Sequence, residues 1–174
     1  MFAKLNKAFD PVPYDITSTG VGFLIDGKGI QYYDIATDKA QFFAVIPERF
    51  RKEFCLHLMH IDRDIPPHID DKIRTSINFY ILTEDCETKY FRVNKKASTQ
   101  QIENQTNGVI FDESELTFVD SFVAQPGEAW LLDVTLPHSV KANPHFKERL
   151  AFSLSTGTFS YSEVLSLLKE TGCL

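Results

Sequence analysis

Short runs of apolar and β-branched residues recur along the whole chain, and most are bounded by Gly, Pro, Asp or Asn. Runs of this kind are typical of β-strands that end in turns. The predicted strands are residues 21–25, 29–35, 55–61, 74–82, 89–93, 116–124, 129–134 and 149–155. The polar stretch at residues 95–107 is expected to be a surface loop or a short solvated helix. Many short strands with few helices favour a β-sandwich or a jelly-roll barrel.

Two segments carry helix signals. The PERFRKEF segment at residues 47–54 predicts a short helix, and residues 160–171 predict an amphipathic helix at the C-terminal end. The second helix has Ser160 and Glu163 at the spacing of a capping box, and Gly172 is a typical stop. Because no repeat or linker separates these elements, residues 1–174 are expected to form a single domain.

Two of the predicted strands have one apolar face and one face of polar or small residues, since side chains alternate along a strand. In the first strand the polar face consists of Arg74, Ser76, Asn78 and Tyr80. In the second strand the corresponding face consists of Arg149, Ala151, Ser153 and Ser155. This pattern is typical of a sheet whose apolar face is covered by helices and whose polar face is turned inward. It predicts the wall of a ligand-binding barrel.

Composition narrows the range of partners. The chain has 18 Lys and Arg against 24 Asp and Glu, a net charge of −6 without any basic run, which argues against nucleic-acid binding. Its three cysteines, Cys55, Cys86 and Cys173, lack C-x-x-C spacing, so neither a disulfide framework nor a cysteine zinc site is expected. No apolar stretch approaches the roughly 18 residues of a membrane span. These features predict a soluble, cytoplasmic protein that binds neither nucleic acid nor membrane.

Two histidines and a carboxylate stand in positions that suit a metal ion. His68 and Asp70 lie two residues apart and project to the same side of an extended segment, and His138 follows a predicted strand seventy residues later. Two imidazoles and one carboxylate make the facial triad that holds non-haem Fe(II) and leaves positions open for substrate and oxygen. An H-x-D tripeptide on its own is more often a solvated turn, so the hypothesis needs a further residue.

Arg149 is that residue. It follows His138 by eleven positions and begins a strand whose inner face continues with Ala151 and Ser153. A guanidinium inside a barrel is suited to bidentate binding of a carboxylate, and a buried arginine without an anionic partner would be costly.

The combination of H-x-D, a distal PHSV and RLAFS resembles the Fe(II)/2-oxoglutarate-dependent dioxygenases, whose fold is a double-stranded β-helix, a jelly-roll or cupin-like barrel. The distal half, PGEAWLLDVTLPHSVKANPHFKERLAFSLS, is most similar to the aspartyl/asparaginyl β-hydroxylase branch, which includes hydroxylases of free proline. The resemblance covers about residues 54–157. It implies a mainly β barrel core over this range with a few flanking helices.

The resemblance also implies roles for individual residues. Iron would be bound by His68, Asp70 and His138, and the cosubstrates would be 2-oxoglutarate and O₂. Arg149 would bind the distal carboxylate of 2-oxoglutarate, with Ser153 a candidate for the same end.

The family usually has an R-x-H on the strand after the first ligands, which contributes to cosubstrate or substrate binding. Here Arg74 supplies the arginine, but Ser76 stands where histidine is expected, and a shifted alignment brings Asn78 to that position. Tyr80 faces the expected barrel interior and is either a cosubstrate contact or a structural hydroxyl. The stretch from Arg74 to Tyr80 followed by ETKYF is also similar to prolyl 4-hydroxylases, without their Gly-Gly.

The expected function is therefore hydroxylation of an amino acid, or of a residue in a peptide or protein, with release of succinate and CO₂. The partner would be a small molecule or a peptide, and the oligomeric state is left open. The alternative is a non-catalytic, cupin-like binding barrel or a degenerate oxygenase, which the departure at Ser76 favours. An oxygenase acting on nucleic-acid bases is a third alternative, and the acidic balance counts against it.

Overall fold

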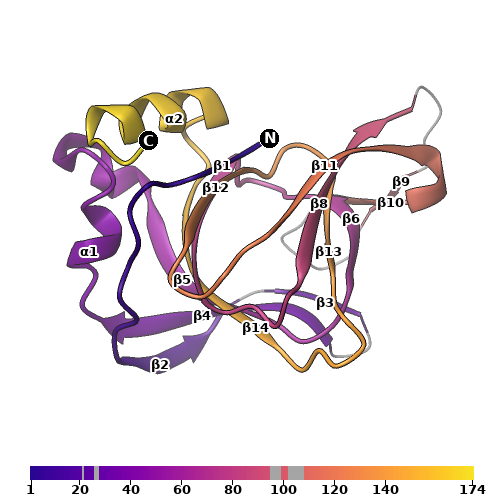
Figure 1. Ribbon diagram of the computed structural model, residues 1–174, viewed down its shortest axis with the longest axis horizontal. Helices are drawn as coiled ribbons and strands as arrows, with labels where there is room; N and C mark the ends of the chain where they lie inside the picture. The colour runs from indigo at the N-terminus through magenta and orange to yellow at the C-terminus, as the bar shows by residue number, and fades with distance from the viewer. Residues whose placement is uncertain (21, 26–27, 95–98, 102–107) are drawn as a thin grey trace.

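The computed structural model describes residues 1–20, 22–25, 28–94, 99–101 and 108–174, which form a mainly β structure with two antiparallel sheets and few helices. In the first sheet the strands lie in the order β1 (Phe2–Lys4), β12 (Ala129–Asp133), β7 (Thr75–Leu82), β14 (Arg149–Thr156), β5 (Cys55–Ile61), β4 (Lys28–Thr37) and β2 (Tyr14–Thr19), and β3 (Phe23–Ile25) also pairs with β4. In the second sheet the order is β11 (Leu116–Val123), β8 (Glu87–Val93), β13 (His138–Lys141), β6 (Ile65–Ile69), β10 (Val109–Phe111) and β9 (Thr99–Gln101). Figure 1 shows β8, β13 and β6 standing opposite β12 and β5.

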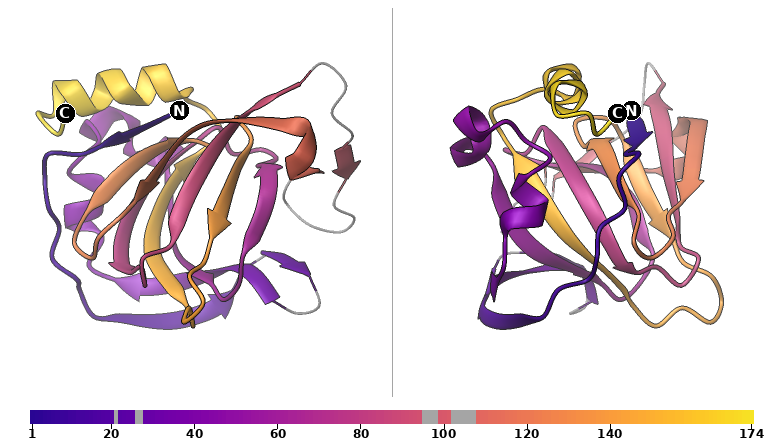
Figure 2. Two further views of the ribbon diagram at one scale, coloured as in Figure 1. Left: turned by 45° about the vertical axis from the view of Figure 1, so that its right-hand side comes forward. Right: turned by 60° about the vertical axis from the view of Figure 1, so that its left-hand side comes forward.

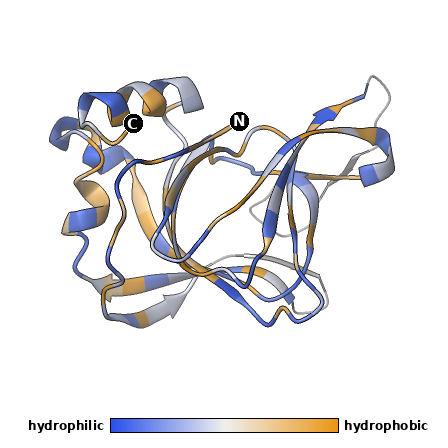
Figure 3. Cartoon of the chain, in the orientation of Figure 1, coloured by the Kyte–Doolittle hydropathy of each residue, from blue (hydrophilic) through white to orange (hydrophobic). Residues whose placement is uncertain are grey.

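The central strands of the first sheet have the two faces that the alternation predicts. Ile77 and Phe79 of β7 pack with Phe152 of β14 in an apolar cluster on the outer face. Tyr80 and Ala151, which are cross-strand neighbours, belong to a second cluster between the two sheets. The apolar and polar positions therefore alternate along these strands as expected, and Figure 3 shows this alternation of hydropathy along the chain.

Helices cover the outer face of the first sheet, where Figure 2 shows them (α1, Ala40–Phe43; α2, Tyr161–Glu170). Phe42, Val164 and Leu168 bring their side chains into the outer cluster. A short 3₁₀ helix, Glu48–Glu53, lies where the sequence predicts a helix. Among the described residues, no helix is long and apolar enough to cross a membrane.

The C-terminal helix begins and ends as its sequence predicts. The Ser160 side chain accepts a hydrogen bond from the backbone amide of Glu163, and the Glu163 carboxylate accepts one from the backbone amide of Ser160. This capping box satisfies amide groups that would otherwise lack partners at the first turn. Gly172 follows the helix with φ +72°, a conformation that favours glycine.

Strand β6 was not among the predicted strands, although it carries one of the expected ligands. It reads IPPHI, and its two prolines cannot donate ladder hydrogen bonds. The structure accommodates them with a bulge: His138 pairs with His68 and Val140 with Ile65, so β6 has one more residue than β13 between these pairs.

Part of the polar stretch at residues 95–107 is a strand. Thr99–Gln101 forms β9 at the edge of the second sheet, where it pairs with β10. These three residues are therefore not a loop or a helix. The rest of the stretch, residues 95–98 and 102–107, lies outside the described residues.

Candidate metal site and buried arginine

Strands β6 and β13 bring the three expected metal ligands together. His68 and His138 are cross-strand partners with ring centroids 4.3 Å apart, and Asp70 follows β6 directly. One ligand atom from each of the three residues lies within 4.8 Å of the others. The distance from His68 Nε2 to Asp70 Oδ1 is 3.5 Å. A single ion between them can therefore contact all three, which makes this group a candidate metal site.

Backbone carbonyls set the orientation of both imidazoles. His68 Nδ1 lies 2.9 Å from the carbonyl oxygen of Pro66, and His138 Nδ1 lies 2.9 Å from that of Leu136. A carbonyl oxygen only accepts, so each Nδ1 is the protonated nitrogen and each Nε2 carries the lone pair. Metal-binding histidines commonly have this arrangement, because the bond to the outer nitrogen fixes the tautomer and the ring plane.

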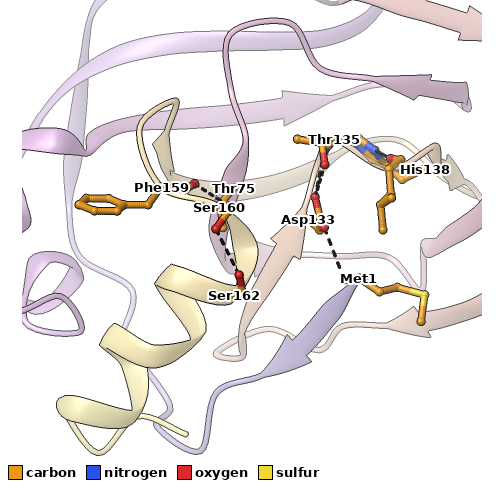
Figure 4. Close-up of polar contacts among 9 residues, drawn as sticks. Met1, Thr75, Asp133, Thr135, His138, Phe159, Ser160 and Ser162 are labelled. Carbon is orange, nitrogen blue, oxygen red and sulfur yellow. Dashed lines mark hydrogen bonds and ion pairs between the residues drawn. The ribbon is translucent and has the colours of Figure 1, made fainter.

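The side chain of Asp133 holds the segment that leads to His138. The Asp133 carboxylate accepts hydrogen bonds from the backbone and the hydroxyl of Thr135, and it lies 3.9 Å from the amino group of Met1 (Figure 4). The backbone amide of Asp70 donates to the carbonyl of Val134, 3.0 Å away. This bond ties the two ligand-bearing segments together.

Burial determines the charges of these residues. His68 and His138 are 1% and 7% exposed, and burial lowers the pKa of both, that of His68 to about 4. Both imidazoles are therefore neutral at pH 7, which is the form that binds metal. Burial raises the pKa of Asp70 to about 6, because a carboxylate is poorly solvated there. A bound cation would supply the charge that favours the ionised carboxylate.

Arg149 is fully buried in the same cavity and has no carboxylate partner among the described residues. Its Nη1 donates to Thr88 Oγ1 at 3.0 Å, and its Cζ lies 4.5 Å from the centre of the Tyr80 ring. Nε and Nη2 are buried without any hydrogen-bond partner in the described part of the chain. A buried cation with unused donors is unfavourable unless an anion completes it.

The three ligands and Arg149 line one cavity between the two sheets. Ser76, Asn78 and Tyr80 line it too, as their alternation along β7 predicts. The cavity holds about 40 Å³, which is room for an ion and a few water molecules. Six further lining residues are apolar. Five lie on or directly after strands of the first sheet, and Val140 lies on the second sheet: Ile30, Met59, Ile61, Leu132, Val134 and Val140.

Two of the expected cosubstrate residues are placed elsewhere. Arg74 precedes β7, is exposed, and contacts the carbonyl of Thr158 rather than the cavity. The expectation that it shares the inward polar face of this strand is therefore wrong. Ser153 is buried on the inner face of β14, but it does not line the cavity, and its hydroxyl lies 2.9 Å from that of Ser76.

The sequence pattern missed two polar residues of the cavity wall. Thr88 lies on β8 and is the one hydrogen-bond partner of Arg149 among the described residues. Tyr32 lies on β4, and burial raises the pKa of its hydroxyl, with the nearby Asp70 adding to the effect. Thr88 belongs to the ETKYF stretch, but the resemblance gave it no role, and Tyr32 belongs to no motif. The pairing of distant strands brings both residues to the site. The alternation of β4, in which Ile30 and Tyr32 share a face, was the available signal.

Comparison with known proteins gives no family for this chain. No protein-family model matches the sequence, and no curated protein matches it significantly.

Proposed function

We propose that this protein is an Fe(II)- and 2-oxoglutarate-dependent dioxygenase that hydroxylates an amino acid or a residue in a peptide. The observation that carries the proposal is that one cavity holds both the His68, Asp70 and His138 group and Arg149, which has no carboxylate partner among the described residues. The two histidines and the aspartate suit a divalent metal that keeps coordination positions open, and the arginine suits a carboxylate. A cosubstrate that chelates a metal at one end and carries a carboxylate at the other fits both.

The arrangement of the strands supports the same proposal. The two sheets enclose the cavity between them, and both contribute to its wall, as in a double-stranded β-helix or jelly roll. The ligands lie on the smaller sheet, and Arg149 begins a central strand of the larger one. We therefore propose the jelly-roll barrel as the architecture that holds the site.

The residues of the chain would each have a definite task. His68, Asp70 and His138 would hold Fe(II), which with 2-oxoglutarate and O₂ supplies the oxidising power for hydroxylation and leaves succinate and CO₂. Arg149 would bind the distal carboxylate, and the apolar wall would exclude water from the reacting centre. Because the cavity is small, side chains of its wall would have to move outward as 2-oxoglutarate enters.

The alternative of a barrel that binds ligands without catalysis has one observation in its favour. Ser76 occupies the position where the related enzymes have histidine, and its hydroxyl bonds to Asn78 Oδ1 at 2.7 Å and faces Ser153. These small polar groups therefore bond to one another at the position where a histidine would contact the cosubstrate. A protein that binds metal and 2-oxoglutarate but never forms succinate would support this alternative.

The deciding experiment measures succinate formed from 2-oxoglutarate by the purified protein with Fe(II) and O₂, over a panel of free amino acids and short peptides. We expect succinate to depend on Fe(II) and to disappear in His68→Ala and in Asp70→Ala. His145→Ala is the matched control, because His145 lies in an exposed loop outside the cavity. Normal turnover in either ligand variant would refute the proposal.

A further inference from the structure

A second, more open pocket lies next to the metal cavity. It has a volume of about 280 Å³, and its walls include Tyr32, His57, Asp71, Lys72 and Ser155. Tyr32 lines both this outer pocket and the metal cavity. A molecule in the outer pocket would therefore be separated from the metal site by one side chain. The volume is at the lower end of the range for small-molecule sites.

One wall of the outer pocket continues the chain directly from the candidate metal site. Asp71 and Lys72 directly follow the expected ligand Asp70. Lys72 has φ +62°, which is uncommon for residues with a side chain. Gly157 lies so close to this turn that a Cβ there would come within 2.2 Å of the Lys72 carbonyl oxygen. Unusual backbone conformations of this kind cluster at ligand-binding sites.

The same wall carries two opposite charges. Asp71 and Lys72 are exposed, and neither forms an ion pair or hydrogen bond among the described residues. Their charges are thus available at the edge of the outer pocket. The pocket is also bordered by His57, whose Nε2 lies 3.5 Å from the Asp34 carboxylate, and Ser18 donates a hydrogen bond to that carboxylate. His57 therefore has its charged partner outside the pocket.

We propose that the outer pocket binds a small zwitterion that has an ammonium and a carboxylate on the same carbon atom, as a free α-amino acid has. Lys72 contacts the carboxylate and Asp71 the ammonium, at the solvent-exposed rim where charged groups keep part of their hydration. The uncharged remainder of the molecule extends past Tyr32 toward the metal cavity. This inference rests on the proposed function and names the substrate class for it.

A residue inside a peptide fits this pocket less well. Its nitrogen and carbonyl are amides without charge, so they would leave Asp71 and Lys72 without ionic partners. A free amino acid, in contrast, has one charge of each sign to offer to the two residues at the rim. Blocked amino acids, which have the same side chain but lack one charge, therefore separate the two substrate classes.

The test is calorimetric and does not depend on turnover. The full chain is loaded with Mn(II) and 2-oxoglutarate without oxygen and is titrated with the twenty free L-amino acids. We expect saturable binding of at least one of them, and at least tenfold weaker binding of its N-acetyl and its amide derivatives. Lys72→Gln and Asp71→Asn are expected to weaken the same ligand at least tenfold, while Lys52→Gln and Asp10→Asn, both exposed and outside the pocket, bind as the wild type does.

Three results would overturn the inference while the proposed function stands: no free amino acid binds, the blocked derivatives bind equally well, or only peptides bind. In each case Mn(II) and 2-oxoglutarate would still bind. A chain that fails to bind Mn(II) would instead contradict the proposed function itself, so the two failures are distinguishable.

Discussion

His68 and His138 lie directly opposite each other on β6 and β13, although they are seventy residues apart in the chain. Their register brings the two rings to a centroid distance of 4.3 Å. The Nδ1 atom of each ring donates a hydrogen bond to a backbone carbonyl, which fixes the orientation of the ring. The metal site is therefore a property of strand pairing and depends on the bulge that places His68 at this position. Mutations that shift the register are expected to destroy the site without touching a ligand.

Metal binding is expected to stabilise the fold. A ligand that binds only the folded state at one hundred times its Kd adds about 2.7 kcal/mol to the free energy of unfolding. For a chain of this length that corresponds to a rise in Tm of roughly 5–10 °C. Differential scanning calorimetry with and without Mn(II) measures it. The rise should vanish in His68→Ala and persist in His145→Ala, and an equal rise in both variants would contradict the site.

Arg149→Met is expected to abolish 2-oxoglutarate binding without lowering the stability of the ligand-free protein. The substitution removes a buried cation that has no anionic partner among the described residues, so the Tm of the ligand-free protein should not fall. The stabilisation that 2-oxoglutarate adds to the Mn(II)-loaded protein should be lost. In Arg149→Lys the charge remains but the bidentate geometry does not, and binding should weaken at least tenfold. Retained 2-oxoglutarate binding in Arg149→Met would show that the anion binds elsewhere.

Gly157→Ala is expected to damage the metal site from outside it. The added Cβ would meet the Lys72 carbonyl oxygen at 2.2 Å. Because the Cβ is bonded directly to Cα and the oxygen is a backbone atom, one of the two backbone segments must shift. We expect a loss of about 1–3 kcal/mol in the free energy of unfolding and weaker Mn(II) binding. Gly172→Ala is the control, since nothing lies within 4 Å of its Cβ: it should cost about 1–2 kcal/mol through its positive φ alone and leave Mn(II) binding unchanged.

The cysteines should differ sharply in reactivity. Cys55 is exposed, whereas Cys86 is fully buried and burial raises the pKa of its thiol to about 11. Because the thiolate is the reactive form, iodoacetamide should modify Cys55 in the native protein but reach Cys86 only after unfolding. Raising the pH from 7 to 9 should not change this order. Peptide mapping by mass spectrometry measures both rates, and equal modification would contradict the burial of Cys86.

The alternation of side chains predicted the interior of the site better than its edges. Ser76, Asn78 and Tyr80 line the cavity because a strand must place every second residue on one face. The rule failed for Arg74, which precedes the first paired residue of β7 and is free to turn outward. It also placed Ser153 on the correct face without showing how far it lies from Arg149. At about 3.3 Å per residue, four residues of strand separate them by roughly 13 Å.

The strands that carry the ligands were the hardest to predict. The two prolines of β6 argue against a strand by composition, and β13 has only four residues, too few for a clear pattern. Thr88 and Tyr32 were missed because the alternation along their own strands does not show which distant strands they will face. The residues of the candidate metal site were nevertheless predicted to come together, since their chemical types and spacing do not depend on recognising the strand.

The hydrogen bond from the Asp70 amide to the Val134 carbonyl has a consequence for how the protein would acquire its metal. During synthesis the chain exposes His68 and Asp70 long before His138 exists, and two ligands alone hold an ion weakly. The complete site forms only when the segment around residue 134 has closed against the end of β6. Under the proposed function, loading with metal would therefore be an event of the folded chain, and the folded apoprotein would be the species that binds the ion.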